Sequence, residues 1–364
     1  MTIDDATPQK PGTPRVLVVD DPSFDAHAPR GYHPERPERL GAARRAVERA
    51  AAGGARVERL EAREATFDEI ARAHDAAYVE AFVALDGKQG AIDADTYVAP
   101  GSVRAARRAA GGACALVEAL LAAPANEARG VALLRPPGHH ATRAQAMGFC
   151  LLHNAAIAAA HALERGAERV AVVDWDVHHG NGTQDIFWRD PRVLYVSLHQ
   201  SPLYPGTGRV DDVGEGEGAG FTVNVPLAPG ATRAVYDEAF DAVVVPVLER
   251  FAPDLVIVSA GFDAHARDPL AAMELDDAAY GSMARALGGV AARSAGGRVA
   301  LLLEGGYDLG AIEGSLAESI AAIVGQREPE PDVLWSDARP GVVSAEHADE
   351  IARARTVTAR RWRI

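Results

Sequence analysis

The stretch VAVVDWDVHHGNG, residues 170–182, begins as a buried strand and ends in a group of ionisable side chains. Four apolar residues are followed, within six positions, by Asp174, Asp176, His178 and His179. Ionised groups are costly to bury unless they are paired or bind a ligand. The stretch therefore predicts that the end of a central strand faces a shared polar site.

Similar apolar runs recur along the chain, and most are separated by helical patterns. Strands that are apolar throughout and alternate with helices are typical of a mainly parallel sheet covered on both faces. We therefore expect an α/β fold with an open sheet, whose strands fall at 15–20, 131–136, 169–174, 193–199, 221–227, 254–261 and 298–306. Helical patterns occupy residues 38–52, 102–123, 153–166 and 232–251, with Gly111 and Gly112 as a weak point in the second.

The composition is that of an ordinary globular protein. The chain has 364 residues, of which 48% are hydrophobic and 24% charged. This length allows one large α/β domain or two, and either buries a core without disulfides. The pattern predicts a flexible tail at 1–14, a single domain over 15–325 and a C-terminal extension, 326–364, with one short helix.

Charge and targeting signals narrow the classes of partner. The net charge of −14 argues against nucleic acid as a partner of the bulk surface. No apolar stretch is long enough to cross a membrane, and the N-terminus lacks the features of a signal peptide. Cys114 and Cys150 form no spacing motif, which favours reduced thiols and a cytoplasmic location. The oligomeric state is left open, a homo-oligomer included.

Five segments carry polar side chains directly after apolar runs. In an open parallel sheet, the carboxyl ends of the strands lie along one edge, where ligand sites form. The sequence therefore brings nine side chains to this edge: His139, His140, Asp174, Asp176, His178, Ser197, His199, Asp263 and Tyr307. The ionisable group at the end of the 169–174 run is thus one side of a shared site.

The pair Asp176 and His178 suits a divalent metal. On an extended segment, residues two apart point the same way, so a carboxylate and an imidazole lie side by side. A catalytic zinc needs three protein ligands and an open position for water, and Asp263 is the natural third ligand. Taken alone, the pair could equally be a polar turn.

Two further motifs carry side chains suited to catalysis. RPPGHHA, residues 135–141, offers adjacent histidines, one of which could act as a general base toward water. EGGYDL, residues 304–309, places Tyr307 where its phenol could donate to a developing oxyanion. Taken singly, the two histidines could instead lie on the surface, and the tyrosine could instead pack beside a turn. Phe149 and Tyr204 lie in glycine-flanked loops. Their rings could form the walls of a channel or pack in the core.

Taken together, these motifs resemble the histone deacetylase superfamily, which includes bacterial histone deacetylase-like amidohydrolases and acetylpolyamine amidohydrolases. The resemblance covers residues 15–325 and rests on GYHPERPERL, HDAAYV, RPPGHHA, GFCLLHNAAIAA, DWDVHHGNGTQ, VSLHQSPLYPGTG, NVPL, SAGFDAH and LEGGYDL, in the family's order. It implies the arginase–deacetylase fold and a zinc-dependent hydrolase that cleaves linear amides.

The resemblance also implies a role for individual residues. The zinc ligands are then Asp176, His178 and Asp263. The catalytic group consists of the general base His140, its partner His139, the transition-state residue Tyr307, Asp174 behind His139, and Asn181 behind His140. With asparagine at position 181, the chain resembles the class II branch of the family, whereas other members have aspartate there.

The substrate channel and two cation sites follow from the same resemblance. The channel residues are Gly148, Phe149, Tyr204, Leu270 and the rim acid Asp95; Tyr204 replaces the commoner phenylalanine. A structural K⁺ or Na⁺ beside the zinc matches Asp174, Asp176, His178, Ser197 and Leu198. A second such site matches Phe187, Asp190, Val193 and Phe221.

The substrate stays the most open question. Some acetylpolyamine hydrolases carry a gatekeeping acid seven residues after the last zinc ligand, where this chain has Leu270. An acetyl-lysine-like substrate is therefore favoured, with an acetylpolyamine or another small acylated amine as the alternative. A ureohydrolase would need two manganese ions and more bridging carboxylates. A non-catalytic binding module would not need the intact base, tyrosine and ligand set.

Overall fold

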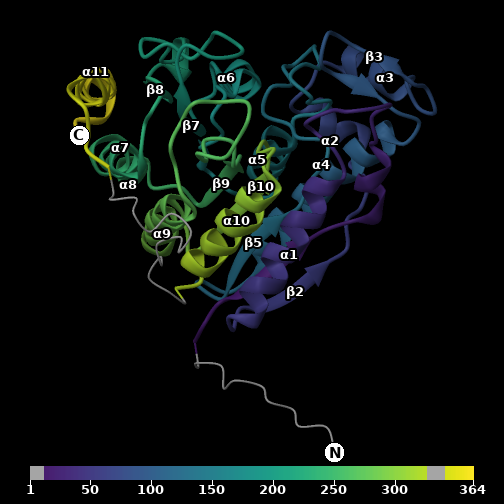
Figure 1. Ribbon diagram of the computed structural model, residues 1–364, viewed down its shortest axis with the longest axis horizontal. Helices are drawn as coiled ribbons and strands as arrows, with labels where there is room; N and C mark the ends of the chain where they lie inside the picture. Colours follow the sequence, from purple (N-terminus) through teal and green to yellow (C-terminus); the bar gives the residue numbers. More distant parts are fainter. Residues whose placement is uncertain (1–11, 326–340) are drawn as a thin grey trace, which may run out of the picture.

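The computed structural model describes residues 12–325 and 341–364. Most of the predicted tail, 1–14, and the first part of the predicted extension, 326–340, therefore lie outside the described residues. An open sheet of eight parallel strands crosses the molecule (Figure 1). In spatial order its strands are β2 (Arg56–Leu60), β1 (Arg15–Val19), β5 (Ala128–Ala132), β10 (Val299–Leu303), β9 (Leu255–Ala260), β6 (Val170–Asp174), β7 (Val193–Gln200) and β8 (Thr222–Leu227).

The inner strands are buried along their whole length, which explains their unbroken apolar sequences. Every residue of β6, β7, β9 and β10 is buried. This is expected when a parallel sheet is covered by helices on both faces. The predicted α/β fold with an open parallel sheet is therefore confirmed.

Two strands differ from the expected pattern. β5 ends at Ala132, so residues 133–136, which belong to the expected strand, leave the sheet and lead into the loop that carries the adjacent histidines. The apolar pattern does not reveal β2 at all. This strand lies at the edge of the sheet, where its residues are exposed or half-buried, and its sequence RVERL is largely polar.

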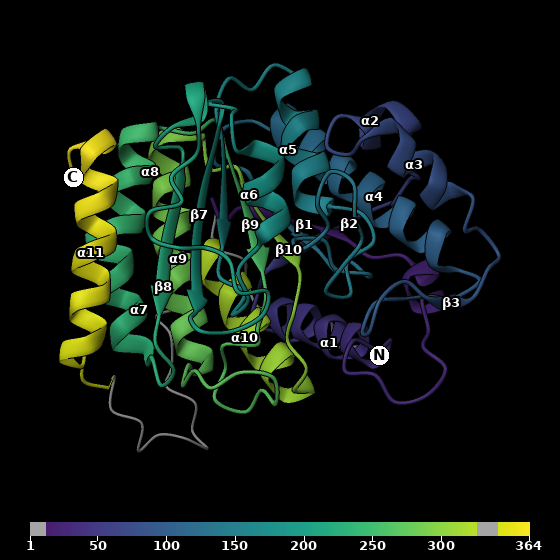
Figure 2. The same cartoon turned by 90° about the horizontal axis from the view of Figure 1, so that it is seen from above.

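Helices form an outer layer on each face of the sheet (Figure 2). On one face α1 (Glu38–Ala52), α10 (Leu309–Ile323) and α9 (Asp277–Ser294) pack side by side, and on the other α4 (Ser102–Ala122) packs against α5 (Asn154–Glu164). Gly111 and Gly112 lie within an unbroken α4. Most of its residues are buried, and one row of buried apolar side chains recurs every three or four residues, as helical packing requires: Val103, Ala106, Ala110, Ala113, Val117 and Leu120.

The helix expected over residues 232–251 consists of three consecutive segments. α7 (Arg233–Ala239) passes into a π-helical turn, Phe240–Val244, and then into α8 (Val245–Phe251). Pro246 has no backbone N–H to continue the regular ladder, which accounts for the interruption. The smaller elements are α2 (Phe67–Ala71), α3 (Ala76–Val83), α6 (Asn181–Phe187), the 3₁₀ turns Pro22–Ala26 and Gly216–Gly218, and the ribbon of β3 (Gly90–Ala91) and β4 (Tyr97–Val98). Among the helices of the described ranges, none combines the length and apolar character needed to cross a membrane.

The last helix, α11 (Ala345–Trp362), is longer than the short helix expected in the C-terminal extension. Ser344 caps it by accepting a hydrogen bond from the His347 backbone N–H. The helix packs against β8 and is the outermost helix on that side of the molecule (Figure 2). Because β8 is an edge strand, α11 shields an edge that would otherwise be open to pairing with another chain.

We predict that Trp362→Ala lowers the free energy of unfolding by roughly 1–3 kcal/mol, because the half-buried indole packs at the end of α11. Its ring contacts Phe221 and Phe251, and its Nε1–H donates to the Gly220 carbonyl at 2.7 Å. Trp362→Phe keeps an aromatic ring and loses the hydrogen bond, so it should cost only about 1 kcal/mol. Urea denaturation of both variants tests the docking of α11; equal, negligible losses would contradict it.

Candidate active site

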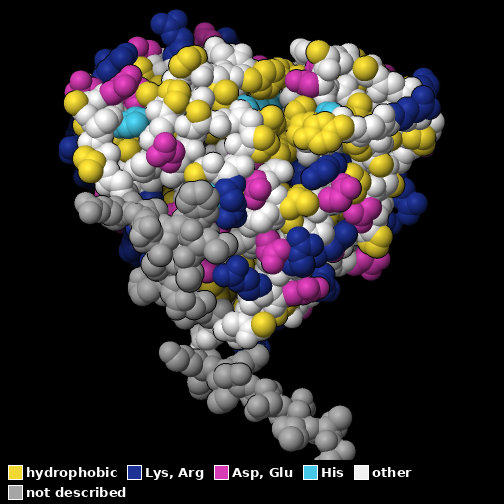
Figure 3. Space-filling model, viewed as in Figure 1, with side chains coloured by type: hydrophobic (Ala, Val, Ile, Leu, Met, Phe, Trp, Pro, Cys, Tyr) yellow, Lys and Arg dark blue, Asp and Glu magenta, His cyan; other side chains and the backbone are white. Residues whose placement is uncertain are grey.

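A cavity of about 260 Å³ opens at the carboxyl edge of the sheet. It is lined by Asp95, Pro137, His139, His140, Gly148, Phe149, His178, Leu203, Tyr204, Leu270, Gly305 and Tyr307. The lining combines histidines with aromatic and aliphatic side chains. Figure 3 shows a similar combination, histidines among hydrophobic side chains, at the notch in the upper rim of the molecule. Residues from loops far apart in the sequence thus meet at one opening.

His178 lines this cavity, and the carboxylates of Asp176 and Asp263 converge on its imidazole. Asp176 and His178 follow β6, and Asp263 follows the neighbouring strand β9. The His178 Nδ1 atom lies 3.2 Å from Asp176 Oδ1 and 3.1 Å from Asp263 Oδ2. All three side chains are buried, so the two carboxylates face each other across an imidazole in a nearly dry environment.

Backbone groups fix the outer oxygens of both carboxylates. The Gly305 N–H donates to Asp176 Oδ2 at 2.8 Å, and the Val177 N–H donates to Asp263 Oδ1 at 2.9 Å. A Cβ atom at position 305 would lie 2.2 Å from Asp263 Oδ2 and 2.5 Å from Asp176 Oδ2. Only glycine therefore lets the loop after β10 approach so closely. Such outer contacts orient metal ligands in proteins.

These three residues fit a zinc ion. One ligand atom from each lies within 4.8 Å of the other two. In a tetrahedral site with bonds near 2.0 Å, ligand atoms lie about 3.3 Å apart, close to the separations from His178 Nδ1. A second group of candidate ligands, Glu69, Cys114 and His161, fits a metal less well.

Two observations count against that second group. Arg63 already binds both oxygens of the Glu69 carboxylate, at 2.8 and 2.6 Å. Burial raises the pKa of the Cys114 thiol far above its ordinary value, so the thiolate that a metal needs is disfavoured. Within the described residues, the group of Asp176 is thus the better metal centre.

The adjacent histidines of the RPPGHHA loop have different partners. His140 Nδ1 lies 2.8 Å from Asn181 Oδ1, while the Asn181 amide donates back to the His140 carbonyl. An acceptor oxygen at Nδ1 places the ring proton there and leaves the Nε2 lone pair free. His139 Nδ1 lies 3.1 Å from Asp174 Oδ2, so its partner is a carboxylate.

The environments of the two imidazoles shift their pKa values in opposite directions. Burial, followed by the neighbouring His139 and His178, lowers the pKa of His140 well below its ordinary value. Burial also lowers the pKa of His139, but the Asp176 and Asp174 carboxylates outweigh it and raise that pKa. His140 is therefore the neutral imidazole of the pair, the form that accepts a proton.

Tyr307 faces the cavity from the loop after β10. Its backbone N–H donates to Asp268 Oδ2 at 2.6 Å, and its ring lies edge-on to Phe149 with the centroids 5.9 Å apart. Burial raises the pKa of the Tyr307 phenol well above its ordinary value. The phenol is therefore protonated and can donate a hydrogen bond into the cavity.

The five residues predicted for the channel all line the cavity: Gly148, Phe149, Tyr204, Leu270 and Asp95. The Tyr204 ring lies edge-on to His140, with the centroids 5.1 Å apart, and remains 39% exposed. Asp93, the other acid considered at the rim, accepts hydrogen bonds from the Asp95 and Thr96 backbone N–H groups. Asp93 therefore stabilises a turn, while Asp95 lies at the mouth of the cavity.

Comparison with known proteins agrees with this geometry. The histone deacetylase domain model matches residues 33–323. The chain belongs to the histone deacetylase family. Membership in this family supports the prediction from the sequence that the chain is an amidohydrolase of the deacetylase type.

Two curated relatives and a solved structure illustrate the similarity. A probable deacetylase of Archaeoglobus fulgidus is 38% identical over 345 residues, 91% of this chain and 94% of the relative. A histone deacetylase-like amidohydrolase of Pseudomonas aeruginosa is 46% identical over 256 residues, 70% of this chain and 67% of the relative. The crystal structure of the HDA15 HD domain matches with a TM-score of 0.86 and 37% identity, covering 96% of this chain and 97% of that one.

The residues predicted for monovalent cations fall in two places in this deacetylase fold. Asp174 and Ser197 are register partners on β6 and β7, beside Asp176 and His178, with Leu198 next along β7. The second set lies where α6 leads into β7 and consists of Phe187, Asp190, Val193 and Phe221. The Asp190 N–H donates to the Phe187 carbonyl, and the Val193 N–H donates to the Asp190 carbonyl. The Tyr195 N–H donates to the Phe221 carbonyl. Both cation sites stay predictions.

Three residues that support the site are not evident from the sequence pattern. Gly305 shapes the space around the carboxylates, and Asp268 anchors Tyr307. Glu304 accepts hydrogen bonds from the Gly138 and His139 backbone N–H groups, at 2.6 and 3.2 Å. The one available signal is the position of Glu304, a carboxylate at the end of the apolar run LLLEGGY.

We predict that Gly148→Ala destabilises the protein by about 1–3 kcal/mol more than Gly206→Ala. Both glycines have a positive φ, of 55° and 80°, so both variants place an alanine in the left-handed region. A Cβ at position 148 would lie 2.5 Å from His140 Cδ2, whereas nothing lies within 4 Å of one at position 206. Chemical denaturation measures the difference, and equal losses would mean that Gly148 does not confine the histidine.

Proposed function

We propose that the chain is a zinc-dependent deacetylase that hydrolyses the amide of an acetylated amine, with an acetyl-lysine-like group as its substrate. One observation carries the proposal: His178 of the candidate metal-ligand set, a neutral imidazole and a protonated phenol line the same cavity, and Asp176 and Asp263 contact His178 directly behind it. Each supports one requirement of amide hydrolysis, which needs an activated water, a proton carrier and a donor for the oxyanion.

Asp176, His178 and Asp263 would hold the zinc ion. When bound, zinc polarises a carbonyl and lowers the pKa of water. Two buried carboxylates and an imidazole, which would be neutral when it binds the metal, are donors that catalytic zinc sites use, with a fourth position left open.

The histidines move the protons. His140 accepts a proton from the attacking water through Nε2, because Asn181 keeps the other ring proton on Nδ1. Asp174 orients His139 beside it, with the ring centroids of the two histidines 4.0 Å apart. A protonated histidine then delivers a proton to the leaving amine, and the Tyr307 hydroxyl donates a hydrogen bond to the oxyanion.

The walls of the cavity favour a single apolar side chain carrying the amide. Phe149, Tyr204 and Leu270 contribute rings and an aliphatic group, which suit the methylenes of a lysine. Leu270 places no charge where a second ammonium could bind. An acetylpolyamine is the second candidate, because the Asp95 carboxylate lies at the mouth of the cavity and could attract a cation.

A two-manganese ureohydrolase site is not supported. It would need further bridging carboxylates, and the acids beside the ligand set are engaged: Glu304 accepts from the Gly138 and His139 N–H groups, and Asp174 has three partners. Its oxygens contact His139, the Tyr195 hydroxyl and the Asp176 backbone N–H. A cytoplasmic location, bound K⁺ or Na⁺ and the oligomeric state stay predictions from the sequence.

The first test measures metal and acetate together. We expect the purified protein to bind one zinc per chain and to release acetate from an acetyl-lysine peptide. Asp263→Asn should weaken zinc binding by more than the roughly 10–100-fold typical of losing a residue that only orients a ligand. Asp268→Asn, which alters a buried acid outside the ligand set, should retain the metal; equal zinc affinity in both variants, by titration of the apoprotein, would reject the site.

The second test isolates the phenol. Tyr307→Phe should lower kcat by on the order of 10²–10³, since it removes one oxyanion donor and leaves the ring. Zinc content and the melting temperature should stay close to those of the wild type. A variant with wild-type turnover would show that Tyr307 only packs.

The third test separates the two substrate classes. We expect a higher kcat/KM on acetyl-lysine peptides than on N-acetylated polyamines, because no carboxylate replaces Leu270. The two substrates should be compared at one salt concentration, since screening weakens attraction between Asp95 and a dication. A preference for the polyamine would assign the enzyme to the alternative class.

A further inference from the structure

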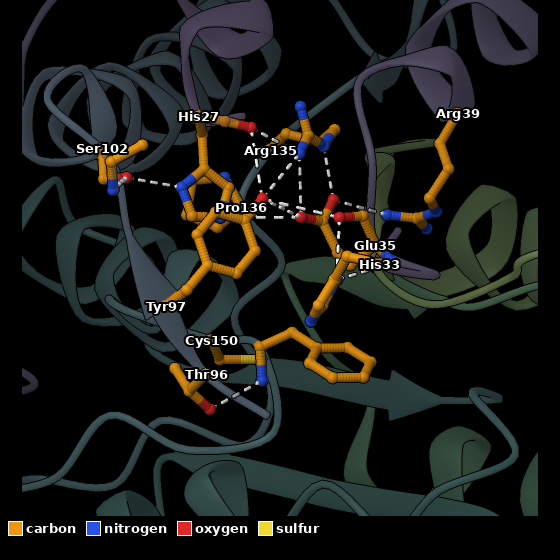
Figure 4. Close-up of polar contacts among 12 residues, drawn as sticks. His27, His33, Glu35, Arg39, Thr96, Tyr97, Ser102, Arg135, Pro136 and Cys150 are labelled. Atoms are coloured by element: carbon orange, nitrogen blue, oxygen red, sulfur yellow. Dashed lines mark hydrogen bonds and ion pairs between the residues drawn. The ribbon is translucent and has the colours of Figure 1, made fainter. Parts of the chain in front are cut away.

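The segment GYHPERPERL, residues 31–40, carries a wholly buried carboxylate that the proposed chemistry does not use. This carboxylate belongs to Glu35, and its side chain is 0% exposed. It lies between the guanidinium groups of Arg39 and Arg135, which are also wholly buried (Figure 4). Two cations and one anion are thus held together inside the protein.

Glu35 satisfies both arginines at once. Arg135 donates through Nε to Glu35 Oε1 and through Nη2 to Oε2, the latter at 2.8 Å. Arg39 donates from Nη1 to Oε1 at 3.2 Å. Burial raises the pKa of Glu35, but Arg135, His27 and Arg39 outweigh it and lower that pKa to about 2. The carboxylate is therefore charged.

Arg39 links Glu35 to the loop that contains the candidate catalytic tyrosine. Its Nε donates to the Gly306 carbonyl at 2.6 Å, and its Nη2 donates to the Glu304 carbonyl. Its guanidinium carbon lies 5.2 Å from the centroid of the Tyr307 ring. Arg39 thus binds the main chain on both sides of Gly305 and contacts the tyrosine itself.

Arg135 links Glu35 to the loop that contains His139 and His140. It is the first residue of RPPGHHA, four positions before His139. Its guanidinium also donates to the Phe24 and His27 carbonyls, at 3.1 and 2.7 Å, which ties the start of this loop to the N-terminal segment. Glu35 is therefore the one carboxylate that contacts both arginines among the described residues.

We propose that Glu35 is a positioning residue that holds the Tyr307 loop in register with the His139–His140 loop. This proposal rests on the function proposed above. Without the carboxylate, two buried guanidiniums would face each other with no anion between them, an arrangement that costs much more than it returns. Arg39 would then move away and release the carbonyls of Glu304 and Gly306, so the phenol would no longer be fixed opposite the base.

The kinetic test uses Glu35→Gln, which keeps the shape of the side chain and removes its charge. We expect kcat to fall on the order of 10–10²-fold, the cost of a small misplacement of a reacting group, while KM changes less than about threefold. In a Tyr307→Phe background the same substitution should change kcat by less than about threefold, because the hydroxyl that Glu35 positions is already absent. An equal loss in both backgrounds would overturn the proposal.

A matched control separates positioning from general destabilisation. Glu69→Gln also removes the charge of a nearly buried glutamate bound by an arginine fork, from Arg63, but it lies on α2, away from the loops. It should lower the melting temperature and leave kcat unchanged. A fall in kcat equal to that of Glu35→Gln would show that any buried ion pair has the same effect.

Amide hydrogen exchange gives a readout that does not depend on activity. In Glu35→Gln, peptides covering residues 303–308 should exchange faster than in the wild type, and in Glu69→Gln they should not. If the wild type shows no deacetylase activity, the proposed function fails and this exchange still decides the role of Glu35. Unchanged exchange at 303–308 would overturn that role.

Glu35→Asp covers the case in which the glutamine variant does not fold. It retains the charge and shortens the reach, so it should keep the fold and show a smaller effect of the same kind. Wild-type kcat together with wild-type exchange at 303–308 in a folded Glu35→Asp or Glu35→Gln protein would exclude the positioning role.

Discussion

Two carboxylates that share one buried imidazole set the constraint on which the rest of the site depends. Asp176 and Asp263 are wholly buried, and each has an oxygen within 3.2 Å of His178 Nδ1. Like charges so close repel each other unless a cation or a proton lies between them. The order of the strands makes the arrangement possible: β9 lies between β6 and β10, so the loops after these three strands meet. The close approach of Gly305 follows from the same order.

Chemistry and selectivity are carried by different parts of the fold. The candidate metal ligands follow the ends of β6 and β9, which a rigid sheet holds in place. The walls come from distant loops that contact one another through rings: His33 lies edge-on to Phe149, and Phe149 lies edge-on to Tyr307. Phe149 itself has a φ of 70°, a strained conformation for a residue with a side chain, and Thr96 accepts its backbone N–H at 3.1 Å. Loop changes can thus alter the walls without disturbing the ligand set.

The sequence reveals those parts of the molecule that have a local pattern. The inner strands are visible as unbroken apolar runs, and α4 is visible as an apolar pattern with a helical period, because both are buried. The Asp176–His178 pair is visible because two residues on an extended segment share a face. β2 is hidden, and the sequence predicts only a short helix where the 18-residue α11 lies, since an edge strand and a surface helix are largely polar. Glu35 and Glu304 are hidden for another reason: their partners lie far away in the chain, as with Glu35 and Arg135 at a separation of 100 residues. The individual roles of the site residues came from the family resemblance and not from periodicity.

The place of β10 in the sheet has a consequence for the order in which the molecule forms. Within residues 12–325 and 341–364, β10 is the last strand in sequence, yet it lies between β5 and β9 and joins the β2–β1–β5 group to the β9–β6–β7–β8 group. Its pairing with β5 connects Ala300 with Gly130, a contact of high sequence separation that forms slowly. Gly305 and Tyr307 follow directly after this strand. The loop that carries these two residues therefore reaches its place beside the candidate ligands only when the strand that unites the sheet is inserted between β5 and β9.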